Sequence, residues 1–190
     1  MSLYNEDVPF GTEDSGNLPK FFVNFLKKRG NRSELPEGNT CVFLDEQKVR
    51  ASSVTYGLVT IEMDSKIPHE LFIVDIPQGK MIDYILASAS IYPAFKPHSI
   101  NDVRFVDGAY HDNLPVKMAL KKGATDVIAV DLDAFGVVNK ETLKLAKRSI
   151  YIKSYWNLGP TLVFDHNTIQ RNIRLGYLDT LKAYGAYEGY

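Results

Sequence analysis

The sequence has a single cysteine, Cys41, one tryptophan and no long apolar run. One cysteine excludes a disulfide framework and any multi-cysteine metal site, and it favours a reducing compartment. The longest uncharged run, from Tyr84 to Phe95, is shorter than the roughly 18 residues of a transmembrane segment. The N-terminal residues lack the basic start and the apolar stretch of a signal peptide. We therefore expect a cytoplasmic protein.

No excess of positive charge is present either. The 190 residues include 22 Lys and Arg against 23 Asp and Glu, so the formal net charge is −1. A nucleic-acid-binding protein normally has a basic excess, and we expect no nucleic-acid partner. Hydrophobic residues make up 45% and charged residues 24% of the chain, a composition typical of an ordinary globular protein with a core.

Apolar periodicity predicts strands alternating with helices from Val54 onward. The runs Val54–Ile61 and Leu71–Val74 predict two strands that can pair as neighbours, and Asp126–Asp131 is the clearest buried strand. We also expect helices over Pro19–Lys28, from Gln78 to before Pro93, over Pro115–Gly123 and Lys140–Arg148, and from Thr168 onward, with short strands over Thr40–Leu44, Arg104–Val106 and Ile150–Ile152. On the last helix, Ile169, Ile173, Tyr177, Leu181 and Tyr184 share one face.

This alternation predicts an α/β fold with a largely parallel sheet covered on both faces. Such folds place their chemistry at the carboxyl ends of strands. The tripeptide Asp107-Gly108-Ala109 directly follows one strand, where a carboxylate could face a cleft, although Asp-Gly is also a common turn. Asp131 and Asp133 lie at the end of another strand, and there a loop or helix-cap role is favoured over metal binding.

A serine nucleophile would require a sharp strand-to-helix turn with the pattern G-x-S-x-G, and the sequence has none. Ser88 and Ser90 are predicted in a helix, where their hydroxyls can bond to the preceding turn. No glycine-rich loop offers N–H groups to an oxyanion. The four histidines lack metal-ligand spacing, and His111 fits a solvated loop better than a pair with Asp107.

The stretches Ile85–Phe95 and Val106–Val116 resemble the helix, turn and Asp-Gly-Gly/Ala motif of patatin-like phospholipases, including the trailing Asn-x-Pro. The segments Ala119–Gly123 and Asp126–Asp131 are similar to the helix and strand that follow in that family, and Leu175–Asp179 resembles its last helix. The resemblance extends from about Val54 to the C-terminus. It implies a three-layer α/β/α sheet of the hydrolase type.

The resemblance further implies that lipid acyl esters are hydrolysed by a Ser–Asp dyad, without metal or cofactor. Asp107 matches the aspartate that accepts the serine proton, and Gly108 and Ala109 match the small residues beside it. Small side chains there let serine and substrate approach closely. Phospholipase, lysophospholipase and plain esterase activities remain alternatives.

In the family, the oxyanion loop and the nucleophile precede the matched part, and residues 1–53 contain neither. We therefore expect residues 1–53 to be a loop-rich segment with a short helix and a strand. Residues 54–190 would be the C-terminal part of a patatin-like domain whose sheet is incomplete on its N-terminal side. The isolated chain should be inactive, and its exposed sheet edge should promote self-association.

The alternative is a non-catalytic patatin-like protein that binds lipid or a partner. No basic or amphipathic segment is strong enough to predict a membrane-docking face.

Overall fold

The computed structural model describes residues 44–162 and 165–185, which belong to two compact units. The first unit ends at Gly108 and the second begins at Ala109. The helix predicted at Pro19–Lys28 lies outside the described residues, and so does nearly all of the strand predicted at Thr40–Leu44. Each unit is described by itself.

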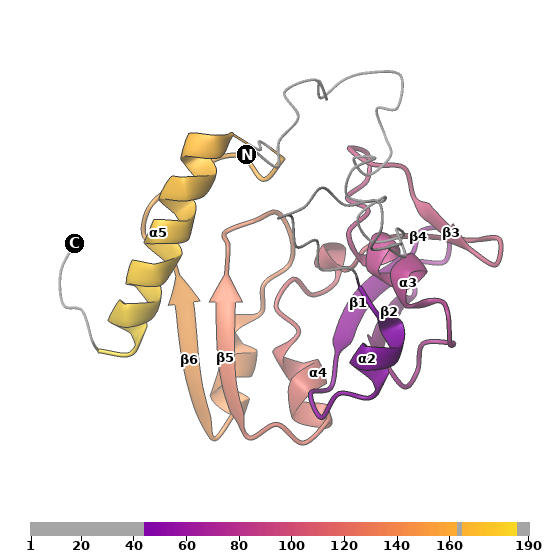
Figure 1. Cartoon of the computed structure of the whole chain (residues 1–190), viewed down its shortest axis with the longest axis horizontal. Helices are drawn as coiled ribbons and strands as arrows, with labels where there is room; N and C mark the ends of the chain where they lie inside the picture. Colours follow the sequence, from indigo (N-terminus) through magenta and orange to yellow (C-terminus); the bar gives the residue numbers. More distant parts are fainter. Residues whose placement is uncertain (1–43, 163–164, 186–190) are drawn as a thin grey trace, which may run out of the picture. The chain divides into compact units, whose positions relative to one another are not determined.

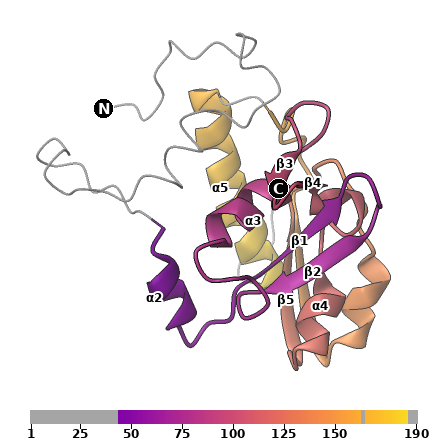
Figure 2. The same cartoon turned by 90° about the vertical axis from the view of Figure 1, so that its right-hand side faces the viewer.

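The first unit is a four-stranded antiparallel sheet with two helices (Figure 2). Its strand order is β2-β1-β4-β3. The elements are α2 (Glu46–Arg50), β1 (Gly57–Glu62), β2 (Pro68–Phe72), α3 (Met81–Ser88), β3 (His98–Ile100) and β4 (Val103–Asp107).

Strand β1 lies at the centre of this unit because its residues are apolar on both faces. Four successive positions, from Leu58 to Ile61, are buried between the neighbouring strands and helix α3. Val54 is exposed, and the strand begins at Gly57 rather than at the start of the β-branched run. The predicted pairing of the first two strands is confirmed, with Gly57 opposite Phe72. The bounds Leu71–Val74 predicted for the second strand are wrong, since it covers Pro68–Phe72 and Val74 is exposed.

The prediction of a largely parallel sheet is wrong for this unit, where every strand pairing is antiparallel. Short connections explain the β1–β2 and β3–β4 pairings, because parallel neighbours need a long crossover whereas antiparallel neighbours can be joined by a tight turn. Only Asn101 and Asp102 separate β3 from β4, and both have positive φ, 50° and 66°. Those angles are typical of the type I′ hairpin turn.

Helix α2 holds the segment that leads into α3. The Glu46 carboxylate accepts hydrogen bonds from the N–H groups of Gly79, at 2.8 Å, and Met81, at 3.4 Å. The Arg50 guanidinium donates to the carbonyl of Ile73, at 2.8 Å, and pairs with Glu46. Burial tends to raise the pKa of Glu46, but the hydrogen bonds from Gly79 and Arg50 bring it below its ordinary value. The start of α3 is thereby fixed to α2.

The second unit contains a pair of parallel strands, β5 (Asp126–Asp131) and β6 (Arg148–Lys153), shown in Figure 1. Its helices are α4 (Val116–Lys121), α5 (His166–Ala183) and the 3₁₀ helix η3 (Lys140–Leu145). The 3₁₀ helix η2 (Gly108–Tyr110) begins with the last residue of the first unit. The core consists of buried apolar residues from α4, β5, η3 and the segment before α4: Leu114, Val116, Ala129 and Leu143. Helix α5 packs along β6.

Most elements predicted for this unit are confirmed. Strand β5 has the predicted bounds, but the prediction that it is buried is wrong, since Ile128 and Val130 are 61% and 53% exposed. Burial depends on what covers each face of the strand, which the apolar run alone does not show. Helix α5 begins just before the expected Thr168, where Asp165 accepts a hydrogen bond from the Thr168 N–H. The predicted polar helix at Lys140–Arg148 is instead the 3₁₀ helix η3, and Arg148 already belongs to β6. The mixed α/β class is confirmed. No helix among the described residues combines the length and the apolar character needed to cross a bilayer.

A tyrosine–aspartate pair joins the two parallel strands. The Tyr151 hydroxyl on β6 donates a hydrogen bond to the Asp131 carboxylate at the end of β5. Burial and this carboxylate together raise the pKa of Tyr151 to about 12. Burial also tends to raise the pKa of Asp131, but the hydrogen bonds from Tyr151 and from the Asp133 N–H lower it below its ordinary value.

We expect Tyr151→Phe to lower the free energy of unfolding by about 1 kcal/mol below pH 10, because one hydrogen bond to a carboxylate is lost. Between the ordinary tyrosine pKa of 10.0 and about 12, Tyr151 ionises in the unfolded chain but stays protonated in the folded one. The free energy of unfolding of the wild type therefore falls between pH 10 and about 12, and its excess over that of the variant should become smaller.

Urea unfolding of both proteins at pH 8, 10 and 11.5 measures this difference in the free energy of unfolding. Tyr177→Phe, at a position 65% exposed, is the control. A gap that stays constant up to pH 11.5 would contradict this account.

Candidate functional site

Asp107 is the last residue of β4 and is half-buried. Its backbone is held from two sides: it pairs in register with Thr60 of β1, and its N–H donates to the carbonyl of Ser90, at 3.0 Å. The Thr60 hydroxyl, fully buried, donates to the carbonyl of Val106, at 2.8 Å. The main chain that bears the carboxylate is therefore fixed by β1 and by the segment following α3.

Gly108 lies against the backbone of β1 with no room for a side chain. A Cβ at this position would stand 2.2 Å from the Val59 carbonyl oxygen and 2.4 Å from the carbonyl carbon. Real Cβ atoms essentially never approach other atoms so closely. The glycine after Asp107 is thus a steric requirement of the β1–β4 contact, in addition to any need for access to the carboxylate.

Ala109 is buried in the second unit and is enclosed by the loop that follows β5. Its carbonyl accepts a hydrogen bond from the Val137 N–H, at 2.8 Å, and the Asn113 N–H donates to the Val137 carbonyl, at 2.7 Å. At Gly136, where φ is 144°, a Cβ would come within 2.9 Å of the Cβ atoms of Ala109 and Asn113. The space beside Ala109 therefore excludes larger side chains.

The two serines in and just after α3 use their hydroxyls structurally. Ser90 lies just beyond the end of α3, not within it as predicted, and its hydroxyl donates to the Leu86 carbonyl, at 2.7 Å. The Ser88 hydroxyl does not bond to the preceding turn but to the carbonyl of Val59, at 2.7 Å. Since each hydroxyl proton is already donated to a backbone carbonyl, neither serine is arranged as a nucleophile.

The other candidate residues have structural partners. Asp131 accepts hydrogen bonds from Tyr151 and from the N–H of Asp133, and Asp133 forms an ion pair with Lys153. No group of three or more metal-ligand side chains occurs in residues 44–162 and 165–185. Asp131 is the last residue of β5 and Asp133 lies in the loop after it, so the predicted loop role fits Asp133 but not Asp131.

The histidines are distributed over both units. The His69 ring contacts Glu62, at 2.8 Å, and that of His98 contacts Asp83, at 3.2 Å. His111 is exposed, and His166 begins α5.

Sequence reasoning missed the residues that hold Asp107 in place. Thr60 and Ser90 lie far from Asp107 in the sequence, and of the two only Ser90 belongs to a stretch that resembles the family. The signal that could have found the serines is the run of small residues at the end of α3, since small side chains allow a helix end to approach a strand closely.

A sequence model of the patatin-like phospholipase family matches residues 13–120, which is more than half of the chain. The match includes Asp107, Gly108 and Ala109 and ends inside α4. The matched segment begins before Val54, the residue at which the resemblance in the sequence begins. It does not extend to β5, β6 or α5. No curated protein matches the chain.

Proposed function

Because the chain belongs to the patatin-like phospholipase family, we propose that it forms part of a serine hydrolase of lipid acyl esters, with Asp107 as the general base. The main support for Asp107 as the base is the position of its carboxylate. A half-buried carboxylate stands at the carboxyl end of β4, on a main chain fixed by Thr60 and Ser90. A fixed carboxylate can meet a nucleophile repeatedly in the same geometry, which is what general-base catalysis requires.

In the proposed reaction, Asp107 removes the proton of a serine hydroxyl while the serine oxygen attacks the ester carbonyl carbon. The tetrahedral intermediate collapses, the C–O bond to the alcohol breaks, and Asp107 returns the proton to the departing oxygen. Water then attacks the acyl-enzyme, again with Asp107 as base, and releases the fatty acid and the serine. The serine belongs to a segment with the G-x-S-x-G pattern, which these 190 residues do not contain.

The dyad proposal predicts that the 190-residue chain alone neither hydrolyses p-nitrophenyl esters nor reacts with a fluorophosphonate probe. The first step is to sequence the parent gene upstream of the codon for Tyr4. If an in-frame G-x-S-x-G segment is found there, the extended protein should hydrolyse the ester and take up the probe at the serine of that motif. Replacing that serine by alanine should abolish both.

The alternative function is non-catalytic binding of a lipid or a protein partner. The structural use of the Ser88 and Ser90 hydroxyls favours it, since neither of these serines is then arranged as a nucleophile. An upstream stop codon followed by a start site, or an extended protein without hydrolysis, would replace the catalytic proposal by this one.

A further inference from the structure

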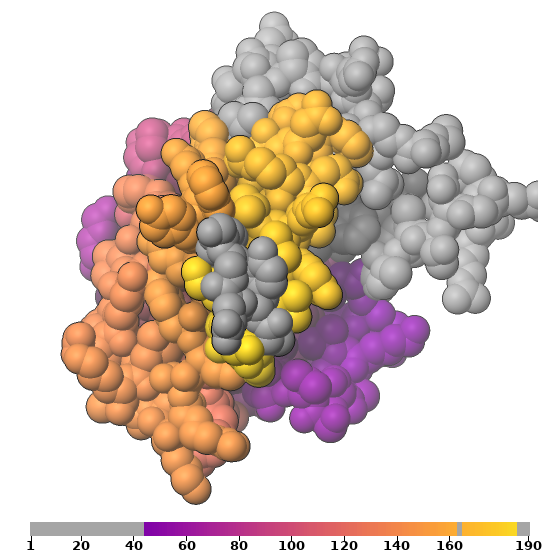
Figure 3. Space-filling view, turned by 90° about the vertical axis from the view of Figure 1, so that its left-hand side faces the viewer, coloured from indigo at the N-terminus to yellow at the C-terminus, as the bar shows by residue number. Residues whose placement is uncertain are grey.

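Helix α5 directs apolar side chains to solvent and a carboxylate to the interior. Ile173, Tyr177 and Tyr184 are 63%, 65% and 53% exposed, whereas Asp179 is the buried residue of the helix, at 6%. The spacing of the three apolar residues places them in one row, here named the α5 stripe. Figure 3 shows α5, in yellow, at the molecular surface. Ile169, Leu175, Leu178 and Leu181 of the same helix are half-buried, so the α5 stripe is exposed in addition to the apolar residues that the helix buries in the usual way.

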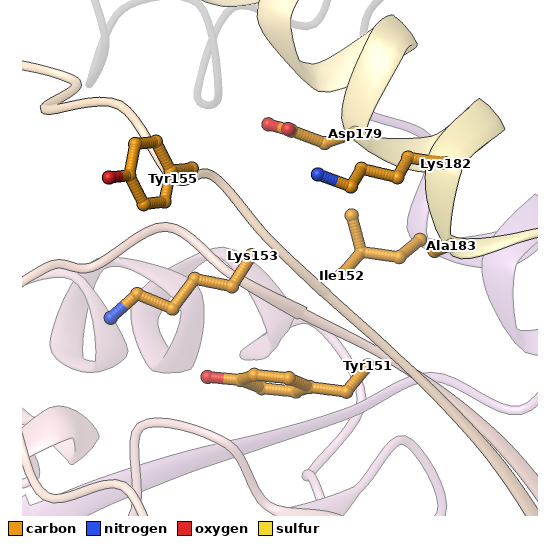
Figure 4. Close-up of a pocket in the computed structure, with 7 residues that line it drawn as sticks. All are labelled: Tyr151, Ile152, Lys153, Tyr155, Asp179, Lys182 and Ala183. Atoms are coloured by element: carbon orange, nitrogen blue, oxygen red, sulfur yellow. The ribbon is translucent and has the colours of Figure 1, made fainter. Parts of the chain in front are cut away.

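The side of α5 that packs against β6 does not include the α5 stripe. Between the two elements is an open hollow of about 230 Å³, lined among others by Ile152 of β6 and by Asp179 and Ala183 of α5 (Figure 4). In Figure 4 the Asp179 carboxylate and the Lys182 side chain extend from α5 on the same side as Ile152. Because α5 packs on β6 through these other residues, its apolar stripe remains available to a partner.

The connection from β6 to α5 adds two exposed aromatic residues. Tyr155 is 83% and Trp156 is 53% exposed, and their rings are in edge contact. The connection is attached to the helix, since the Arg171 guanidinium donates to the Asn157 carbonyl, at 3.0 Å. Tyrosine and tryptophan are enriched at the boundary between water and lipid, where their rings are part apolar and part polar.

The exposed charges of α5 have one sign. Arg171, Arg174 and Lys182 are exposed, whereas Asp179, the only carboxylate within the helix, is buried. Asp165 lies just before the helix and accepts the Thr168 N–H. Basic side chains beside an apolar row, in a helix of low mean hydropathy, are characteristic of helices that lie on anionic membranes.

We propose that α5 lies on an anionic lipid surface, with Ile173, Tyr177 and Tyr184 at the level of the headgroups and Arg174 beside them. This inference rests on the proposed function, because an acyl-lipid substrate resides in such a surface. A lipid surface fits better than a second copy of the chain, since protein interfaces are depleted in lysine and a second α5 would bring the same positive charges into contact.

Co-sedimentation with vesicles tests the proposal. The full chain should sediment with vesicles of phosphatidylcholine and phosphatidylglycerol, and much less with phosphatidylcholine alone. Trp156 is the only tryptophan, so its emission should shift to shorter wavelength on binding. The double variant Ile173→Ser, Tyr177→Ser should bind at least about tenfold more weakly, because two apolar contacts are lost. Arg174→Glu should reduce binding and its dependence on salt.

The matched control is Ile67→Ser, at an apolar position of the first unit that is 52% exposed, and it should bind like the wild type. Circular dichroism verifies that each variant is folded. Equal binding by the wild type and the double variant would overturn the proposal. So would a concentration-dependent dimer that the double variant abolishes, because the α5 stripe would then contact a second copy.

The test is independent of catalysis. Asp107→Asn should bind vesicles like the wild type, since Asp107 does not belong to α5. Vesicle binding without ester hydrolysis by the extended protein would reject the proposed function alone. Hydrolysis of a water-soluble ester without vesicle binding would reject the α5 proposal alone.

Discussion

Replacing Asp107 by asparagine should reduce ester hydrolysis by the extended protein about 10²- to 10⁴-fold, the usual contribution of a positioned general base. The amide has nearly the size of the carboxylate but cannot accept the serine proton at neutral pH. The fold should be retained, because the structure holds this residue through its backbone, by the Ser90 carbonyl and the pairing with Thr60. The measurement is kcat/KM for a p-nitrophenyl ester.

The control for this variant is Asp102→Asn, the same substitution in the turn that precedes β4. Asp102 is exposed and has a φ of 66°, which asparagine adopts readily. Its kcat/KM should equal that of the wild type. Loss of a general base lowers the rate far more than about threefold. If kcat/KM of Asp107→Asn is less than about threefold below that of the wild type, Asp107 is not the base.

Gly108→Ala should destabilise the first unit by at least about 3 kcal/mol, at the upper end of the cost of overpacking. The added Cβ would overlap the Val59 backbone, and a backbone cannot move aside as a flexible side chain can. The melting temperature should fall by roughly 10 °C or more. Thermal unfolding followed by circular dichroism measures the effect.

Two comparisons isolate the cause. Gly176→Ala in α5 adds the same methyl group where no atom lies within 4 Å, so it should be neutral or stabilise the helix by up to about 1 kcal/mol. The double variant Gly108→Ala, Val59→Ala should recover little stability, because the two shortest contacts are to the carbonyl of Val59. Full recovery would show that the Val59 side chain, and not the backbone, sets the requirement for glycine.

Local sequence determined which segments form β1, β5 and α5. The β-branched run that ends at Ile61, the apolar run at Asp126–Asp131 and the apolar spacing after Thr168 are short-range patterns, and each produces its element. Strand β3 and helix α2 were missed, because segments of three and five residues are too short to show a period. The motif Asp107-Gly108-Ala109 was found through its resemblance to a family.

Tertiary structure decided how these elements are used. The two-residue turn at Asn101 and Asp102 permits only an antiparallel pairing of β3 with β4, and alternation of strands and helices could not reveal that. The need for glycine at position 108 arises from Val59, which lies far away in the sequence.

The same holds for α5. Its spacing shows that Ile173 and Tyr177 share a face, but a helical period does not say whether that face meets the core or the solvent. The structure places Asp179 against β6 and leaves the apolar stripe outside. Periodicity is a property of one helix, whereas burial depends on the surface against which that helix packs.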